Sequence, residues 1–286
     1  MREAIAAGMY YERDGELLKD EIEAHYEGPR APGALPLSRA EGKTLAIIAP
    51  NSPYKNCADC MAWSYKAIAE SPTPDVYIII ATNQHSQETG LSVTTFNTPL
   101  GFARVDQELA KTVAAKGTIG VNEEIHSRDH VIEVQLPFLL HAKRQEIEKV
   151  KILPVLVSKG IDVKRLALDI QEALMDLKRK AIFIVSTDLT HYGPLFHYVP
   201  FSLDVQRNIY DMDRGAIEII RKQDPDEFLA YVKDRVLNYH GTSAIELLLR
   251  LLPKCKVTLE QYYTSGDVLK DYKNAIAYAA IIFTRN

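Results

Sequence analysis

The chain has 286 residues, of which 47% are hydrophobic and 25% charged, and its formal net charge at pH 7 is −4. This composition indicates a soluble globular protein with a large core, and it excludes the strongly basic surface of nucleic-acid-binding and anionic-membrane-binding proteins. No apolar run approaches the roughly 20 residues of a membrane-spanning helix. Three cysteines, an odd number, favour reduced thiols, and the first residues lack a signal-peptide pattern, so we expect a cytoplasmic protein.

Short apolar runs alternate with amphipathic segments along the chain. Nearly unbroken apolar runs predict strands that are buried on both faces, whereas apolar residues every three to four positions predict helices. The predicted strands are 44–50, 76–82, 150–158, 180–187, 256–265 and 275–284. The predicted helices are 59–70, 106–116, 162–180, 203–222, 225–234 and 242–252.

This order predicts an α/β fold with a central, mostly parallel sheet and helices on both of its faces. The last two strands, which follow each other without a long helix between them, are candidates for antiparallel additions. The Pro/Gly-rich segment 27–42 predicts a surface loop that joins an N-terminal helical arm to the sheet. No linker or internal repeat divides the chain, so we expect one domain over residues 1–286.

Polar residues gather just after three of the predicted strands. The segments "PNSPY" (50–54), "NQHS" (83–86) and "STDLTHYG" (186–193) each follow an apolar run. In open α/β sheets, ligands bind at the carboxyl ends of the strands. We therefore expect these segments to share one crevice. His240, in "NYHGTS", and His130, in "SRDHVIEVQLPF", both stand at predicted helix starts and could join it.

Other polar residues have simpler interpretations. A single loop histidine is more often a surface hydrogen-bonding residue than a ligand, so His25, His126, His141 and His197 are given no site role. Cys57 and Cys60 form a C-x-x-C pair without a second pair at zinc spacing, and we expect them to face a helix interior. The sequence contains no G-x-S-x-G, P-loop or G-x-G-x-x-G pattern.

Six blocks in order resemble the Memo family, also called the AmmeMemoRadiSam system protein B family, which is similar in fold to class III extradiol ring-cleaving dioxygenases. The blocks are spread across about 240 residues of the chain. They are "REAIAAGMYYERDGELL", "APNSPYKNCADCMAWSY", "NQHS", "DHVIEVQLPFLL", "STDLTHYG" and "YHGTSAIELLL".

The resemblance implies a metal site at Asn51, His85 and His240, and a general acid/base at His191. It implies that His130 and Glu133 form a polar, substrate-binding pair in the same crevice. Two positions depart from the family pattern, because Asn51 stands where the family has histidine and His240 where it has cysteine. The implied cofactor is a divalent metal, with iron favoured and zinc as the alternative. A three-histidine set that includes His191, and a metal-free site resulting from Asn51, also stay open.

The chemistry expected of such a site is that of a non-heme-iron, dioxygenase-like oxidoreductase. Histidines hold Fe(II) on one face while His191 takes and returns a substrate proton. Asp188 is expected to fix the tautomer of His191, and Tyr54 and Tyr192 to hydrogen-bond a substrate oxygen. The alternatives are a non-catalytic module that binds a small molecule or peptide in the same crevice, and a metal-dependent hydrolase. Composition and pattern name neither the substrate nor the oligomeric state.

Overall fold

The computed structural model describes residues 1–35 and 43–286, so part of the predicted loop 27–42 lies outside the described residues. The strands are β1 (Thr44–Ala49), β2 (Val76–Thr82), β3 (Gly90–Leu91), β4 (Phe96–Thr98), β5 (Gly101–Val105), β6 (Lys151–Val157), β7 (Ala181–Ser186), β8 (His191–Tyr192), β9 (Lys256–Thr264) and β10 (Ala275–Thr284). The α-helices are α1 (Gly15–Glu27), α2 (Tyr54–Glu70), α3 (Gln107–Ala115), α4 (Glu123–Arg128), α5 (Leu136–Ala142), α6 (Val163–Asp176), α7 (Val205–Lys222), α8 (Pro225–Asp234), α9 (Thr242–Leu251) and α10 (Ser265–Leu269). Three short 3₁₀ turns are η1 (Glu133–Gln135), η2 (Ile147–Lys149) and η3 (Pro194–Phe196).

The strands of the described residues form one mixed sheet. Its order is β4-β5-β6-β2-β7-β1-β10-β8, with β3 paired to β6 and β9 paired to β10. The five consecutive strands β5, β6, β2, β7 and β1 run parallel to one another. The last two strands are antiparallel, as the sequence predicts, because β10 runs against both β1 and β9.

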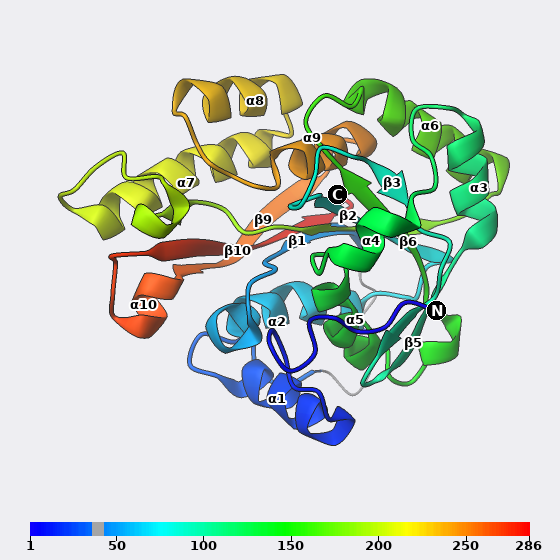
Figure 1. Cartoon of the computed structure of the whole chain (residues 1–286), viewed down its shortest axis with the longest axis horizontal. Coiled ribbons are helices and arrows are strands. Elements are labelled where there is room, and N and C mark those ends of the chain that lie inside the picture. The colour runs from blue at the N-terminus through cyan, green and yellow to red at the C-terminus, as the bar shows by residue number, and fades with distance from the viewer. Residues whose placement is uncertain (36–42) are drawn as a thin grey trace.

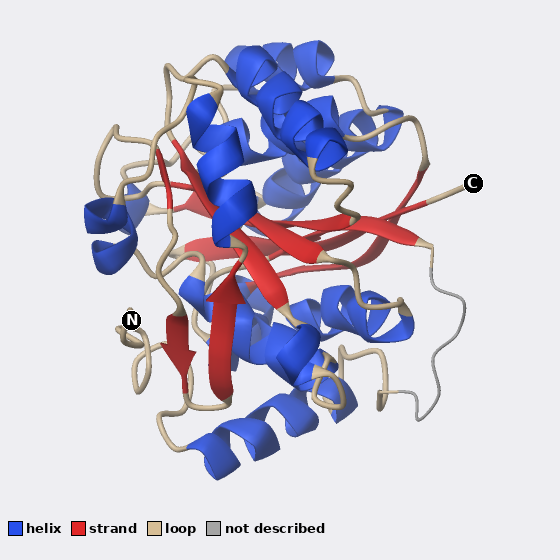
Figure 2. Ribbon diagram, turned by 90° about the vertical axis from the view of Figure 1, so that its right-hand side faces the viewer, coloured by secondary structure: helices blue, strands red, loops and turns tan. Residues whose placement is uncertain are grey.

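Helices cover both faces of the sheet (Figures 1 and 2). In Figure 1, α3, α6, α7, α8 and α9 lie above the sheet, and α1, α2 and α5 lie below it. Alternate residues of one strand therefore enter different cores. Ile48 of β1 packs in the cluster on the α6 and α9 side, while Ile47 packs with α2 and α5. Burial on both faces explains why β1 reads as a continuous apolar run.

The predicted strands and helices match observed ones closely, but β3, β4, β5, β8, α4, α5 and α10 were not predicted. Helix α2 begins at Tyr54, five residues before the predicted start, because Pro53 occupies its N-cap and a proline is well tolerated at a helix start. Cys57 and Cys60 lie on this helix, fully buried and unpaired, as expected. Within the described residues, no helix has the length and apolarity that crossing a membrane would require.

Candidate functional site

The carboxyl ends of three parallel strands meet in the middle of the sheet. β7 lies between β1 and β2, and Ser186 at its end is in register with both Ala49 and Ala81. The Thr187 N–H then donates to the Ala49 carbonyl at 2.9 Å. The chain segments that follow these strands therefore emerge side by side, and we call the residues that they bring together the strand-end site.

Asp188 ties the end of β7 to the end of β1. Its carboxylate accepts hydrogen bonds from the Asn51 N–H at 2.9 Å and from the Ser52 hydroxyl at 2.6 Å. The Asn51 side-chain amide donates to the Ser186 carbonyl at 3.3 Å. Burial raises the pKa of Asp188 to about 6, although the hydrogen bonds from Ser52 and Asn51 oppose this shift. The Asp188 carboxylate is thus held in place by the residues that follow β1.

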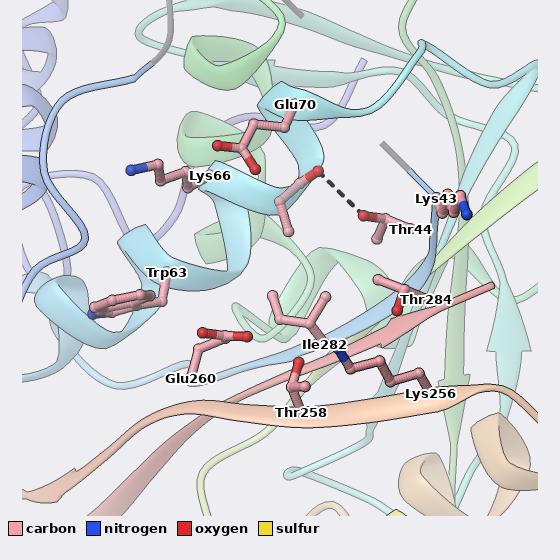
Figure 3. Close-up of a pocket in the computed structure, with 11 residues that line it drawn as sticks. Lys43, Thr44, Trp63, Lys66, Glu70, Lys256, Thr258, Glu260, Ile282 and Thr284 are labelled. Atoms are coloured by element: carbon pink, nitrogen blue, oxygen red, sulfur yellow. Dashed lines mark hydrogen bonds between the residues drawn. The ribbon is translucent and has the colours of Figure 1, made fainter. Parts of the chain in front are cut away.

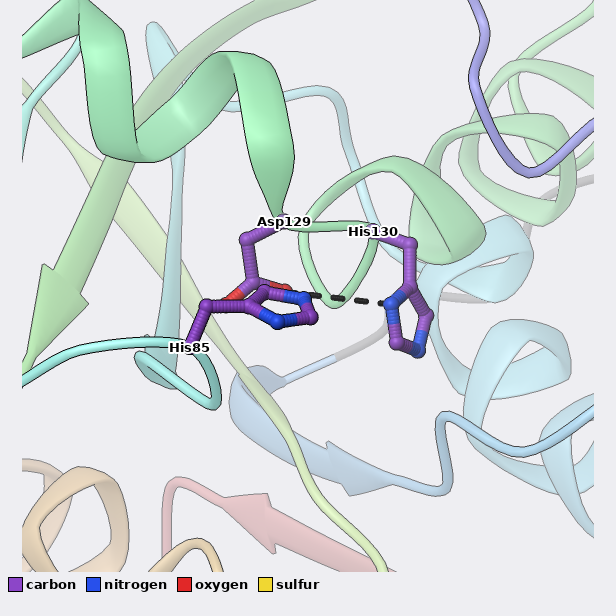
Figure 4. A group of neighbouring side chains, drawn as sticks. All are labelled: His85, Asp129 and His130. Carbon is purple, nitrogen blue, oxygen red and sulfur yellow. Dashed lines mark ion pairs between the residues drawn. The ribbon is translucent and has the colours of Figure 1, made fainter.

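Three possible metal ligands lie close together where the segment after β2 meets the end of α4 (Figure 4). His85, Asp129 and His130 each offer one donor atom, and these atoms all lie within 4.8 Å of one another. The Asn83 side chain builds the turn that carries His85, because its oxygen accepts from the His85 N–H at 2.9 Å. Asp129 is oriented by two main-chain donors, the Gln84 N–H at 2.9 Å and the Val131 N–H at 3.0 Å.

The donor set suits a divalent transition metal. Two imidazoles and one carboxylate form the ligand set of non-heme Fe(II) oxygenases, which leaves further coordination positions open. Metal–ligand bonds of about 2.1 Å place neighbouring ligand atoms no more than about 4 Å apart, so small side-chain rotations would close this group on an ion. Burial lowers the pKa of His130, an effect that His85 adds to and Asp129 opposes, and a neutral imidazole is the form that binds metal.

His191 and His240 form a second group, in which the two imidazole rings are stacked. Their centroids lie 4.1 Å apart at an interplanar angle of 19°, and the Phe196 ring meets His191 edge-on at 5.2 Å. Burial lowers the pKa of each histidine to about 4, and each ring is therefore neutral at pH 7. His191 Nδ1 lies 2.9 Å from the Leu189 carbonyl oxygen. Since that oxygen can only accept, Nδ1 carries the proton and Nε2 holds the free lone pair.

Tyr10 packs against the group of possible metal ligands. Its ring centroid lies 4.2 Å from that of His130. Burial raises the pKa of Tyr10, and the charges of Asp188 and Asp129 raise it further. The Tyr54 N–H donates to the Tyr10 carbonyl at 2.8 Å and holds the N-terminal segment against the start of α2.

The predicted partnership between Asp188 and His191 is wrong. The oxygens of Asp188 are bonded by Asn51 and Ser52 at the end of β1. The proton on His191 Nδ1 goes instead to the carbonyl of Leu189. The Coulombic effect of Asp188 is on His240, whose pKa it raises against the lowering caused by burial.

Glu133 anchors the N-terminal segment and does not present a free carboxylate to a ligand. It is fully buried. It accepts hydrogen bonds from Arg2 Nη1 at 2.7 Å, the Ile5 N–H at 3.0 Å, the Ala6 N–H at 2.8 Å and the Tyr11 hydroxyl at 2.6 Å. The expected pairing of His130 and Glu133 around a substrate would require Glu133 to release these partners.

The hydroxyls of Tyr54 and Tyr192 are engaged in the same way. Tyr54 is fully buried and donates to the Val134 carbonyl at 2.7 Å. Tyr192, also buried, donates to the Phe201 carbonyl at 2.7 Å. Neither hydroxyl has a proton left to give to a substrate oxygen.

A cavity of about 340 Å³ between α2 and the β9–β10 hairpin is separate from the strand-end site (Figure 3). Its lining includes Thr44, the first residue of β1, whose hydroxyl donates to the Ala67 carbonyl at 3.3 Å. The strand-end site follows the other end of β1. Six residues of strand, about 20 Å, therefore separate the two.

Sequence reasoning did not find Asp129 or Tyr10. Asp129 directly precedes His130, and an acidic residue beside a candidate ligand is the signal that was present. Tyr10 lies in the N-terminal segment, far in sequence from every strand end. Its place in the site depends on the Arg2–Glu133 contact at 2.7 Å, which no local pattern reveals.

Comparisons with known proteins identify the family and the fold of the chain. The family model "Memo-like protein" matches residues 2–282, so the chain belongs to the Memo family. It is 30% identical to the MEMO1 family protein MK0963 of Methanopyrus kandleri, with 99% of each chain covered. It is 31% identical to the MEMO1 family protein MmarC6_1286 of Methanococcus maripaludis, over 98% of this chain and 99% of the other. The fold is similar to the crystal structure of uncharacterized protein JW3007 from Escherichia coli K12, with a TM-score of 0.51, 14% identity, and coverage of 83% of this chain and 98% of that one. The α/β fold with a mostly parallel sheet is thus confirmed.

Proposed function

We propose that this protein binds a divalent metal, iron in the first instance, through His85, Asp129 and His130, and acts as a dioxygenase-like oxidoreductase on a small molecule. The observation that carries the proposal is the convergence of two imidazoles and one carboxylate within 4.8 Å. Family membership supports it through the dioxygenase-like fold. Zinc suits the same donors, so metal identity is an outcome of the experiment below.

When bound, Fe(II) would supply a centre at which a substrate oxygen and O₂ meet. The chain's own residues would then manage protons. His191 is neutral at pH 7, with its Nε2 lone pair free to take a substrate proton. His240, stacked on it at 4.1 Å, stabilises the position of the ring. The Tyr10 phenol, beside His130, can donate a hydrogen bond to a substrate oxygen.

The ligand set implied by family resemblance, Asn51 with His85 and His240, predicts different mutant behaviour. If Asn51 were a ligand, Asn51→His should tighten Fe(II) binding by on the order of 10–100-fold, because imidazole is the stronger donor. If His240 were a ligand, His240→Ala should lose the metal. The set proposed here predicts that both variants bind Fe(II) as the wild type does.

Metal analysis of the protein purified without added metal tests the proposal. We expect iron or zinc near one equivalent in the wild type and its loss in His85→Ala. His25→Ala is the matched control, because His25 pairs with Asp59 at 2.8 Å on helices α1 and α2. Equal metal content in all three proteins would refute the proposed ligand set.

Asn51 favours a second candidate, a non-catalytic module that binds a small molecule or peptide at the strand-end site. An amide is a weak metal ligand, and here its nitrogen is already bonded to the Ser186 carbonyl. A protein that takes up neither iron nor zinc under reducing conditions would support this candidate. Its three unpaired thiols are compatible with a reducing cytoplasm, where we place the protein.

A further inference from the structure

Asp213, in the middle of α7, is a buried carboxylate whose charge is not balanced by a cation. It is fully buried, and it forms no ion pair with a lysine, arginine or histidine in the part of the chain that the structure describes. Its partners are three hydroxyls. Thr190 at 2.6 Å and Tyr239 at 2.5 Å donate to Oδ1, and Tyr262 at 2.5 Å donates to Oδ2.

Burial of this carboxylate without a cation lowers the stability of the fold, which suggests that Asp213 has a specific structural role. Burying a carboxylate without a countercharge is unfavourable, and apolar residues of the same volume often replace buried charges without loss of stability. The cost shows in Asp213 itself, since burial raises its pKa to about 6 against the three hydrogen bonds. Its neighbours on the same helix, Ile209, Ala216 and Ile217, are all buried apolar residues.

Two of the three hydroxyls directly adjoin the stacked histidines in the sequence. Thr190 precedes His191, and Tyr239 precedes His240. Both hydroxyls meet the same oxygen of Asp213, so a single atom joins two chain segments that are about 50 residues apart.

A second bridge joins the same two segments. The side chain of Asn238 accepts from the His191 N–H at 3.2 Å and donates to the His191 carbonyl at 2.6 Å. It thereby pairs with the free edge of β8 much as a neighbouring strand would. Val236, two residues earlier, has a φ of 53°, a costly conformation for a β-branched residue, which indicates that this loop is held by its contacts.

We propose that Asp213 is a positioning residue that fixes the stack of His191 on His240 by holding Thr190 and Tyr239 at one carboxylate oxygen. The inference rests on the proposed function only for the role of the histidine pair, which is proton transfer by His191. The stack itself can be tested in metal-free protein, so failure of the metal proposal and failure of this one are distinguishable.

The test compares the removal of single hydroxyls from the same carboxylate. Thr190→Val and Tyr239→Phe each remove a donor beside a histidine. Tyr262→Phe removes the third donor, which lies on β9 and adjoins no histidine. The measured quantity is the NMR chemical shift of the carbon-bound ring protons of His191 and His240, which a stacked ring displaces from the position of an isolated imidazole.

We expect Thr190→Val and Tyr239→Phe to move these signals most of the way toward the isolated value, and Tyr262→Phe to leave them in place. Asp213→Leu should act as the first two do, because it removes the oxygen that accepts from both Thr190 and Tyr239. If Asp213→Leu does not fold, the three single-hydroxyl variants still decide the question. The same shift change in all three, or no change in any of them, would overturn the proposal.

Discussion

Removing the Glu133 carboxylate should strongly destabilise the protein. Glu133→Ala takes away the acceptor of one guanidinium, two main-chain N–H groups and one phenol, and all of these donors except the Ile5 N–H are buried. The Arg2 side chain that it pairs with is 5% exposed, so its charge would stay buried. Breaking a buried ion pair costs about 3–5 kcal/mol. Because Arg2 also donates to the carbonyls of Asp129 and His126, we expect the loss to fall near 3 kcal/mol.

The assay is urea unfolding of Glu133→Ala beside Glu148→Ala. Glu148 also pairs with an arginine, Arg104, at 2.6 Å, but the two side chains are 76% and 54% exposed. Exposed pairs contribute about 0–1 kcal/mol, so the control should unfold almost as the wild type does. Equal stability of the two variants would refute the view that Glu133 anchors the N-terminal segment and would reopen its assignment to substrate binding.

Three further outcomes follow from the site. Burial lowers the pKa of His126 to about 4, below the roughly 6.5 of the unfolded chain. The stability that this provides is complete above pH 6.5 and is lost as the pH falls toward 4, and the lowered pKa values of His191 and His240 add to this loss. The urea concentration at the unfolding midpoint should therefore fall between pH 7 and pH 5, although the raised pKa values of Asp188 and Asp213 act in the opposite sense. His191→Ala should keep the wild-type metal content while turnover falls by on the order of 10²-fold, and loss of metal would make His191 a ligand. Gly241→Ala should cost about 1–3 kcal/mol in the same assay, because a Cβ there would overlap the Thr187 side chain, and an unchanged midpoint would contradict this packing.

The layers of the fold and the main strands and helices follow from apolar patterns in the sequence, whereas the order of the strands in the sheet was not predicted. The run "VYIIIAT" is apolar throughout because both faces of β2 are covered, and it forms a strand over those same residues. The spacing of Leu166 and Ile170 predicts α6, and both residues are fully buried in the observed helix. Short elements such as β3 and β4 were not predicted, because two or three residues carry no detectable period.

The site was only partly predictable, since its contacts join segments that are distant in sequence. Strand ends indicated the region of His85 and Asp188, and these residues follow β2 and β7 in the structure. The partners of Asp188 depend on which strand lies beside β7, and that strand is β1. Glu133 follows His130 by three residues and reads like a site residue, yet its side chain turns to Arg2. A carboxylate beside a histidine in sequence does not reveal which of them faces the ligand.

The most direct test of the account is an anaerobic Fe(II) titration of the metal-free wild type, Asp129→Asn and Asp59→Asn. Asp129 is the proposed carboxylate ligand, whereas Asp59 is a carboxylate bonded to His25 between α1 and α2. The account predicts that Asp129→Asn weakens binding by on the order of 10²-fold, because a charged oxygen ligand becomes a neutral amide, and that Asp59→Asn binds as the wild type does. Wild-type affinity in Asp129→Asn would contradict the assignment of His85, Asp129 and His130 as the metal ligands.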